Sequence, residues 1–218
     1  MYKLLSVLHA LILSTFLLTF AILVPVTNPI MLPLMKHFAP PEDTGLPAAE
    51  YPAVVDTITD YLAGWNGPFQ HIFTVDGTEY AAFTQKEQAH MKDVQDLFAL
   101  CKWICWGSLA LHACFLKHKP VWPTFRRTLL CILAVATAVI IAACIDFNSL
   151  FVFFHKVAFT NDLWLLDPQT DLLIRLMPIE FFISCAAIIG GLWLLGMVAL
   201  LVVSTIFICK AKKGSEIP

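Results

Sequence analysis

Charged side chains are scarce in this sequence. Among 218 residues there are 14 lysines and arginines and 16 aspartates and glutamates, whereas 59% of the residues are hydrophobic and the mean hydropathy is +0.76. Because an ordinary soluble domain has roughly one charged residue in four, this composition excludes that class. The sequence also has no low-complexity tract, and its net charge is only −2. Extended disorder and nucleic-acid binding are therefore excluded as well.

Several catalytic motifs are missing too. The sequence has no glycine-rich phosphate loop, no Gly-x-Ser-x-Gly elbow, no His-Glu-x-x-His and no paired aspartates in an apolar segment, which argues against nucleotide, serine, zinc and intramembrane aspartyl chemistry. All seven cysteines lie in apolar segments, where they are typical packing residues. Cys101 and Cys105 are one helical turn apart but lack a further ligand nearby, so we expect no metal and no cofactor.

Long apolar runs are what the sequence does contain. Four segments are long enough to cross about 30 Å of hydrocarbon as helices. They cover residues 4–24, 97–116, 128–146 and 179–209. The first run has no small-x-small cleavage site, so we interpret it as a retained anchor and not a signal peptide. We predict an all-α membrane protein of one domain, with four transmembrane helices and a small extracellular cap formed by 25–96 and 147–178.

The distribution of basic residues predicts the orientation of these spans. If the spans alternate, eight basic residues and one acidic residue fall on one side, and six basic and fifteen acidic residues fall on the other. The basic side holds Lys3, Lys117, Lys119, Arg126, Arg127, Lys210, Lys212 and Lys213, with Glu216 as its acid. The positive-inside rule places that side, with both termini, in the cytoplasm. We therefore expect the chemistry of the protein on the outer face of a plasma membrane.

The first outward loop contains predicted structure. Aromatic and aliphatic residues recur at helical spacing over 50–65, among them Tyr51, Tyr61 and Trp65, and predict an amphipathic helix. Two interpretations remain open for these rings, because they suit a membrane interface and could also line a pocket. Asp76-Gly77 predicts a two-residue hairpin turn between 72–75 and 78–80.

A helix is expected to follow the hairpin. Thr84 and Glu87 form a capping-box pattern, and nothing breaks the helix between them and 116. His90 lies on its first turns, with Glu87 three residues earlier and Asp93 three residues later. Either carboxylate could orient the imidazole or raise its basicity. A solvated polar face is the alternative interpretation of this pattern.

The second outward loop is richer in aromatic rings. His155 occurs among Phe151, Phe154 and Trp164, and burial among such rings would keep the imidazole neutral and able to act as a base. A purely structural histidine is the alternative. Asp167-Pro168 predicts the start of a short helix over 168–176. The other five histidines, His9, His37, His71, His112 and His118, are interpreted as structural or incidental.

Two stretches carry a family resemblance. The segment from Glu87 through Ala89, His90, Met91 and Lys92 to Asp93 and Val94 is one of them. The other runs from Phe154-His155-Lys156 through Phe159, Asn161-Asp162-Leu163-Trp164 and Asp167-Pro168 to Pro178. Together with four spans, a large first outward loop and a shorter second one, they resemble the bacterial lipoprotein intramolecular transacylase (Lit) family.

The resemblance implies an activity for the chain. It implies a membrane acyltransferase that moves an acyl chain from the sn-2 glyceryl oxygen of a diacylglyceryl lipoprotein to the amine of its N-terminal cysteine, giving the lyso form. His90 and His155 match the two histidines of the family. Membrane lipids are its other expected partners, and we expect a monomer. Gly190, Gly191 and Gly196 could allow close helix contact within the chain or between subunits, and contact within the chain is the favoured interpretation.

The hypothesis for the site joins the resemblance to the residue pattern. His90 and His155 form an acid/base pair, with the two roles unassigned. Glu87 or Asp93 orients His90, Asn161 is an oxyanion donor or a turn residue, and the pocket is walled by Tyr51, Tyr61, Trp65, Phe151, Phe154 and Trp164. The alternatives are a non-catalytic cap protein that binds a lipid or protein partner, and a different interfacial lipid acyltransferase or esterase.

Overall fold

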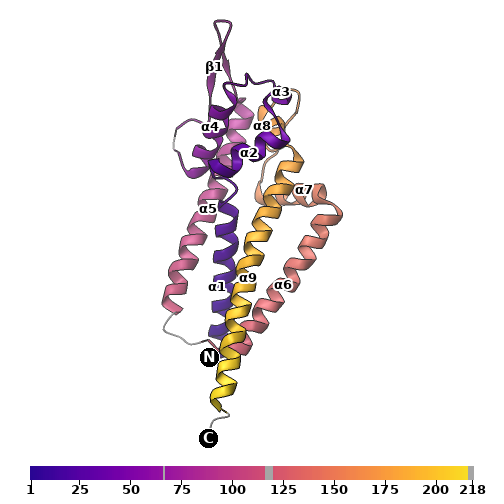
Figure 1. Ribbon diagram of the computed structural model, residues 1–218. Helices are drawn as coiled ribbons and strands as arrows, with labels where there is room; N and C mark the ends of the chain where they lie inside the picture. The colour runs from indigo at the N-terminus through magenta and orange to yellow at the C-terminus, as the bar shows by residue number, and fades with distance from the viewer. Residues whose placement is uncertain (66, 116–119, 216–218) are drawn as a thin grey trace. The chain divides into compact units, whose positions relative to one another are not determined.

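The structure is a computed structural model that describes residues 1–65, 67–115 and 120–215, with the side chains of the last helix described as far as 211. Four of its helices are long and apolar enough to cross a membrane (Figure 1). They are α1 (Tyr2–Leu23), α5 (Gln85–Phe115), α6 (Trp122–Ile145) and α9 (Ile179–Ser215). The predicted all-α membrane fold with four spans is thereby confirmed. Lys117, His118, Lys119 and Glu216, which contributed to the sequence analysis, lie outside the described residues.

The chain divides into two compact units. We call residues 1–22, 101–147 and 188–218 the helical unit, and residues 23–100 and 148–187 the cap unit. The helical unit therefore contains most of α1 and α6 together with the later parts of α5 and α9. The cap unit contains the shorter elements and the earlier parts of α5 and α9. Both candidate histidines belong to the cap unit.

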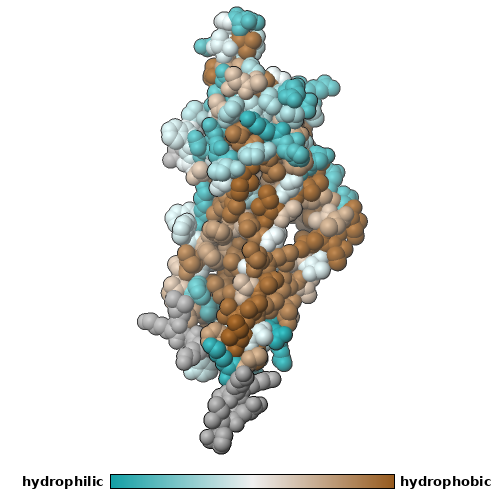
Figure 2. Space-filling model, in the orientation of Figure 1, coloured by the Kyte–Doolittle hydropathy of each residue, from teal (hydrophilic) through white to brown (hydrophobic). Residues whose placement is uncertain are grey.

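The helical unit is held by a small apolar core and a few polar contacts. Ala10, Phe125, Leu129, Trp193 and Met197 are buried together in it. Residues that point out of this core are also apolar, and hydrophobic residues cover the long helices on the face shown in Figure 2. An exterior of this kind suits hydrocarbon as its solvent. All seven cysteines are free, as expected for packing residues.

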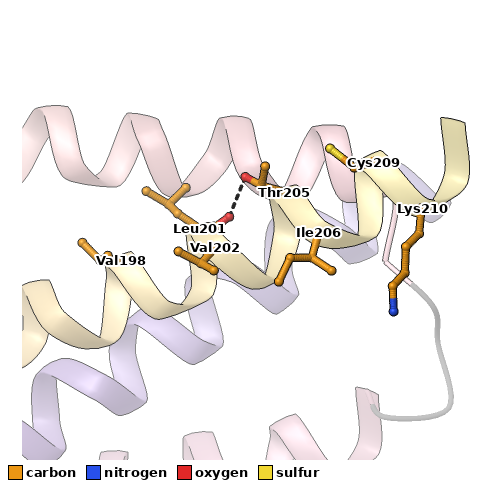
Figure 3. Close-up of a pocket in the computed structure, with 7 residues that line it drawn as sticks. All are labelled: Val198, Leu201, Val202, Thr205, Ile206, Cys209 and Lys210. Atoms are coloured by element: carbon orange, nitrogen blue, oxygen red, sulfur yellow. Dashed lines mark hydrogen bonds between the residues drawn. The ribbon is translucent and has the colours of Figure 1, made fainter. Parts of the chain in front are cut away.

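Polar groups inside the helical unit satisfy one another. The indole of Trp193 donates to the Ser14 carbonyl oxygen at 3.3 Å, and ring nitrogens of His9 and His112 lie 2.9 Å apart. A hollow of about 470 Å³ runs along the late part of α9, where the Thr205 hydroxyl donates to the Leu201 carbonyl (Figure 3). Its lining residues are Val198, Leu201, Val202, Thr205, Ile206, Cys209 and Lys210. All of them belong to the helical unit, so this hollow is not part of the histidine site.

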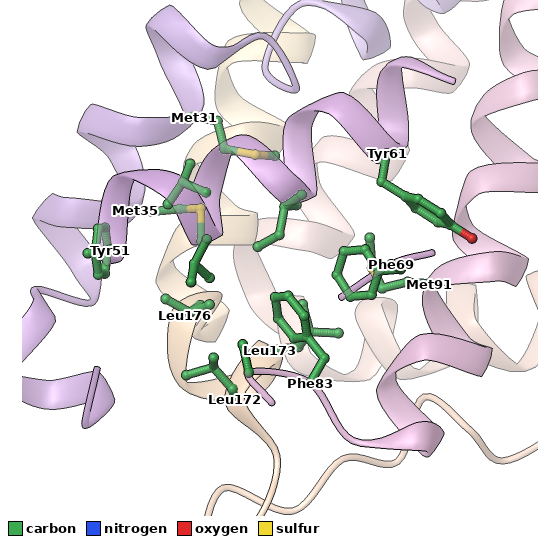
Figure 4. Close-up of a cluster of buried hydrophobic side chains, with 14 of the residues drawn as sticks. Met31, Met35, Tyr51, Tyr61, Phe69, Phe83, Met91, Leu172, Leu173 and Leu176 are labelled. Carbon is green, nitrogen blue, oxygen red and sulfur yellow. The ribbon is translucent and has the colours of Figure 1, made fainter. Parts of the chain in front are cut away.

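The cap unit has its own hydrophobic core (Figure 4). It is formed by α2 (Asn28–Phe38), α4 (Tyr51–Ala63), α8 (Leu172–Leu176) and the first turns of α5. The predicted helix over 50–65 is confirmed as α4, and it ends at Gly64, whose φ of 110° is accessible to glycine. Its apolar face is fully buried in this core, because α2 and α8 cover it. The position of α4 relative to a membrane interface stays a prediction.

Two short-range sequence patterns in the cap unit, the hairpin turn and the capping box, predicted its local structure correctly. The hairpin forms from β1 (Ile72–Val75) and β2 (Thr78–Ala81), paired Val75 to Thr78, with Asp76 and Gly77 at φ of 51° and 79°. The capping box forms as well: the Thr84 amide donates to the Glu87 carboxylate at 2.7 Å, and the Glu87 amide donates to the Thr84 hydroxyl at 3.3 Å. Helix α5 therefore begins where the sequence predicted.

Other segments differ from the expectation. The predicted helix over 168–176 is shorter, because the Asp167 carboxylate accepts from the Gln169 amide and forms a turn, so that α8 begins at Leu172. Helices α2, α3 (Pro41–Thr44) and α7 (Phe147–Ala158) were not predicted. Helix α7 is amphipathic, with most of its apolar residues on one side, and this helical period was missed in the sequence.

Candidate active site

The two candidate histidines lie together. His90 is on the second turn of α5 and His155 is near the end of α7, 65 residues later in the sequence. Both side chains are buried, each 8% exposed, and their ring centroids are 6.3 Å apart with planes inclined by 34°. The ring of Phe159 lies 5.2 Å from His90 and 5.6 Å from His155. Phe159 belongs to the second stretch of the family resemblance but had no assigned role, and in the structure its buried ring lies beside both imidazoles.

Aromatic rings surround His155 as expected. Phe151 lies 4.1 Å away between centroids, Trp164 lies 5.0 Å away and Phe154 lies 5.3 Å away, edge-on. Phe151 also packs on Phe182 of α9 at 4.9 Å. Helix α7 therefore presents His155 to a ring-lined environment, and that environment lowers the pKa of the imidazole below its usual 6.5 because burial disfavours the charged form.

A hydrogen bond fixes the tautomer of His155. Its Nδ1 lies 2.8 Å from the carbonyl oxygen of Phe151, one turn earlier in α7. A carbonyl oxygen can only accept, so the Nδ1 atom must carry a proton and donate it. In the neutral ring, Nε2 then has no proton and holds a lone pair. That atom can act as a base.

His90 differs from His155 in its hydrogen bonding. Its Nδ1 is buried and has no hydrogen-bond partner among the residues that the structure describes. Because a buried polar atom without a partner costs about 1–3 kcal/mol, such an atom in a native protein calls for an explanation, and a substrate group is one. Burial lowers the pKa of His90 to about 4, helped by the neighbouring His155 and opposed by Asp93. His90 is consequently neutral at physiological pH.

Asp93 and Asn161 meet in the structure. The amide nitrogen of Asn161 donates to the Asp93 carboxylate at 2.9 Å, while its carbonyl oxygen accepts from the Leu163 amide at 3.1 Å. Asn161 is therefore a turn residue, and Asp93 occupies one of the two N–H groups of its amide, so the oxyanion role stays a prediction. The pair joins the His90 helix to the segment that follows α7.

Glu87 lies one turn before His90 but points elsewhere. It is fully buried, and its second oxygen accepts from the main-chain amide of Leu173 at 2.6 Å. Its other oxygen is occupied by the capping box. The structure therefore gives Glu87 two amide partners in place of the expected contact with His90, because the loop before α8 packs directly on the first turn of α5.

Asp171 was not identified from the sequence. It is 4% exposed and accepts from the Thr84 hydroxyl at 3.2 Å and from the Asp167 amide at 2.8 Å. With Glu87 it connects the start of α5 to the 167–173 segment. Its hydrogen-bond partners are 87 and four residues away, and no sequence pattern that we identified predicted these contacts.

Three expected pocket rings lie apart from the described histidine contacts. Tyr51 is fully buried in the cap core, and its hydroxyl donates to the Ala39 carbonyl at 2.7 Å. Tyr61 packs against Phe69 in the same core, and Trp65 is 65% exposed. Of the six rings predicted to wall the pocket, the structure therefore brings Phe151, Phe154 and Trp164 to the histidines.

The fold and the site together define a class: an integral membrane protein with a buried histidine pair in an aromatic setting. A comparison with protein families agrees with this class, because the family model "Lipoprotein intramolecular transacylase Lit" matches residues 7–182. The chain belongs to the lipoprotein intramolecular transacylase family, and it is an acyltransferase of bacterial membranes.

Solved structures show the same fold. The integral membrane lipoprotein intramolecular transacylase Lit from Bacillus cereus is similar with a TM-score of 0.81 and 20% identity, over 98% of each chain. Two structures of the same Bacillus cereus protein, in which one histidine is replaced by arginine or by alanine, each give a TM-score of 0.74 at 20% identity. They match over 98% of this chain and 95% and 96% of theirs. The comparison with curated proteins found no match.

Proposed function

We propose that this enzyme moves an acyl chain from the sn-2 oxygen of a diacylglyceryl lipoprotein to the α-amine of its N-terminal cysteine, leaving the lyso form. The observation that carries the proposal is the buried pair of His90 and His155, 6.3 Å apart, with the tautomer of His155 fixed by Phe151. The family supplies the lipoprotein as substrate. The pair supplies an imidazole that can accept the proton that the attacking amine loses.

His155 is the base in this proposal. The α-amine has a solution pKa of about 8, so the ammonium form first loses a proton to solvent and the neutral amine then attacks the ester carbonyl. The Nε2 lone pair of His155 takes a proton from the nitrogen as the carbon–nitrogen bond forms. The resulting imidazolium then gives a proton to the sn-2 oxygen as the carbon–oxygen bond breaks. One proton moves from nitrogen to oxygen, and the enzyme returns to its starting state.

His90 has a different role. A neutral imidazole is a poor proton donor, since losing a proton would leave an anion, but its N–H can donate a hydrogen bond. His90 therefore stabilises the oxyanion of the tetrahedral intermediate by hydrogen bonding. Its low pKa keeps it neutral for this purpose, as burial prevents it from competing for the amine proton. Asp93 and Asn161 act as positioning residues, because their hydrogen bond holds the segments that carry the two rings.

Holding the amine and the ester together in the site supplies the remaining part of the rate acceleration. The reacting amine and ester belong to one molecule, and holding them together in a productive geometry can supply up to about 7–11 kcal/mol. The rings of Phe151, Phe159 and Trp164 around the imidazoles exclude water, which would otherwise hydrolyse the ester. Both histidines come from one chain, so a monomer is sufficient.

The direct test is mass spectrometry of a defined diacylglyceryl lipopeptide after incubation with the purified enzyme. We expect an N-acylated product of unchanged mass from the natural enzyme and none from His90→Ala or His155→Ala. His37→Ala, which removes an exposed histidine of the same unit, is the matched control and should retain activity. Activity in either active-site variant would contradict the pairing. Loss of one acyl chain as free fatty acid would instead indicate an esterase.

We also propose that the cap unit lies outside the cell and that both termini are cytoplasmic. The cap unit contains five basic and fourteen acidic residues, whereas the helical unit holds Arg126, Arg127 and Lys210 near helix ends, which agrees with the positive-inside rule. A Thr74→Cys variant, made after the natural cysteines are changed to serine, should react in intact cells with a maleimide that cannot cross membranes. Labelling only after lysis would reverse the orientation.

A further inference from the structure

Helix α7 has an apolar face that is not covered by the described protein. Phe153 is 63% exposed, Phe154 is 49% exposed and Val157 is 70% exposed, whereas His155 on the other side is buried. With 12 residues the helix is about 18 Å long, too short to cross about 30 Å of hydrocarbon. A membrane span therefore does not explain why this face is exposed.

This face is continuous with the candidate active site. Phe154 contacts the His155 ring edge-on at 5.3 Å and the Phe159 ring at 6.4 Å. Phe159 in turn lies 5.2 Å from His90. A chain of aromatic contacts therefore connects the exposed side of α7, through Phe154 and the buried Phe159, to both imidazoles.

Phe154 differs from the other rings around His155. Phe159 is buried, and Phe151 and Trp164 are partly buried, so among these four rings Phe154 is the one that is exposed. A long apolar group that reacts beside His155 can therefore pass Phe154 more readily than the other three rings. Exposed apolar patches of this kind mark binding sites in many proteins.

We infer that the face formed by Phe153, Phe154 and Val157 binds the acyl chain that is transferred, which enters the site past Phe154. This inference rests on the proposed function, since it places the sn-2 ester carbonyl beside the histidines and its chain along α7. Lys156 is exposed on the same helix, and its ammonium can reach polar groups at the membrane surface while its stem lies on apolar surface.

The test compares diacylglyceryl lipopeptides that differ in the length of the sn-2 chain alone or of the sn-1 chain alone. For Phe154→Ala and Val157→Ser we expect KM for long sn-2 chains to rise about tenfold, because contact with each such side chain is lost. For Val157→Ser, KM for short sn-2 chains and the dependence on the sn-1 chain should not change. Because Phe154→Ala also removes a ring contact of His155, the ratio of KM between long and short sn-2 chains is the quantity compared for that variant. Val135→Ser is a matched control, because Val135 is a valine of α6 with similar exposure, 68% against 70%.

Each outcome bears on the inference. An equal rise in KM for all chains, or the same rise in Val135→Ser, would make the face a general membrane contact and overturn the inference. A change that follows the sn-1 chain would overturn it as well. Absence of transfer by the natural enzyme would refute the proposed function instead, so the two failures are distinguishable.

Photo-crosslinking provides a readout that does not depend on turnover. A photoreactive phenylalanine analogue at position 153, combined with His90→Ala, should crosslink to the sn-2 chain of a bound lipopeptide. The same analogue at position 139, which is exposed on α6, is the control. Equal crosslinking at both positions would overturn the inference.

Discussion

The Nδ1 atom of His155 donates to the carbonyl oxygen of Phe151 at 2.8 Å, so helix α7 itself sets the protonation state of its histidine. Orienting partners of catalytic histidines are often carboxylates, which raise basicity more strongly than a carbonyl does. Here a main-chain group performs this task, and no substitution of a side chain can remove it directly. The base at the site is therefore a weak one, kept neutral by burial.

The pH dependence of the rate should reflect this weak base. Both histidines must be neutral in the proposed mechanism, and the pKa of each is lowered from 6.5 by burial, for His90 to about 4. We expect the acid limb of the rate profile to contain two steps: one near pH 8 from the substrate amine and one below pH 6.5 from the histidines. The measurement is the initial rate of N-acylation in mixed detergent micelles from pH 4 to 9. A histidine step above pH 6.5, distinct from that of the amine, would contradict neutral, buried histidines.

Stability should change with pH in the same range. An unfolded histidine binds its proton near pH 6.5, whereas the folded ones bind only at lower pH, so between pH 6.5 and about 4 the unfolded state holds more protons. The free energy of unfolding should therefore be greatest above pH 6.5 and fall as the pH decreases. Thermal unfolding in detergent checks this. His90→Ala should weaken the dependence, and an unchanged slope would show that other groups cause it.

The Asp93–Asn161 hydrogen bond should affect kcat more than KM. Asp93→Asn or Asn161→Asp alone replaces an amide–carboxylate pair by two like groups, and we expect kcat to fall roughly threefold to tenfold. The double variant restores one amide and one carboxylate with their positions exchanged. If the bond positions the histidines, the double variant should recover most of the rate. Failure to recover would mean that the charge of Asp93 beside His90 matters instead.

Glu87 should contribute mainly to stability. Its buried carboxylate accepts from the Thr84 and Leu173 amides, and hydrogen bonds to a charged group contribute about 1.5–3 kcal/mol. Glu87→Ala should therefore lower the free energy of unfolding several times more than a substitution that breaks an exposed ion pair. The control is Lys92→Ala, which removes the exposed ion pair with Asp96, a kind of pair that contributes little to stability in water. Equal effects in thermal unfolding would contradict this role.

A substitution at Tyr51 should show whether this residue belongs to the cap core or to the substrate pocket. Its hydroxyl has a buried acceptor in Ala39, and burial raises the pKa of this phenol to about 12. Tyr51→Phe should cost about 1 kcal/mol of stability and leave KM and kcat unchanged in the folded protein. A raised KM with unchanged stability would return Tyr51 to the substrate pocket.

The fold was predictable where local patterns or length decide it. Apolar length predicts the four spans, and the Asp76-Gly77 turn and the Thr84–Glu87 capping box depend on residues close in sequence. The two histidines were found because residues around them resemble a family, not because spacing alone identifies them. Their partners were harder to predict. Glu87 has a reasonable partner at helical spacing in His90, but a main-chain amide 86 residues away displaces it.

The roles of the aromatic residues were also difficult to predict from the sequence. Tyr51 and Phe154 look alike in a sequence, since both are aromatic residues in amphipathic segments. Packing decides between them: α2 and α8 cover α4, whereas no described element covers Phe153 and Phe154 on α7. Helix α7 itself was not predicted, although its apolar residues recur at helical spacing and gather on one side.

The contact between Glu87 and the Leu173 amide spans 86 residues of sequence. At about 5–20 residues per second, a ribosome takes roughly 4–17 s to make that stretch. His90 is therefore made, and its helix can form, seconds before the segment that buries it exists. The candidate site is therefore completed late in synthesis, when the segment with His155 and Leu173 has been made, and until then the nascent chain holds half of it.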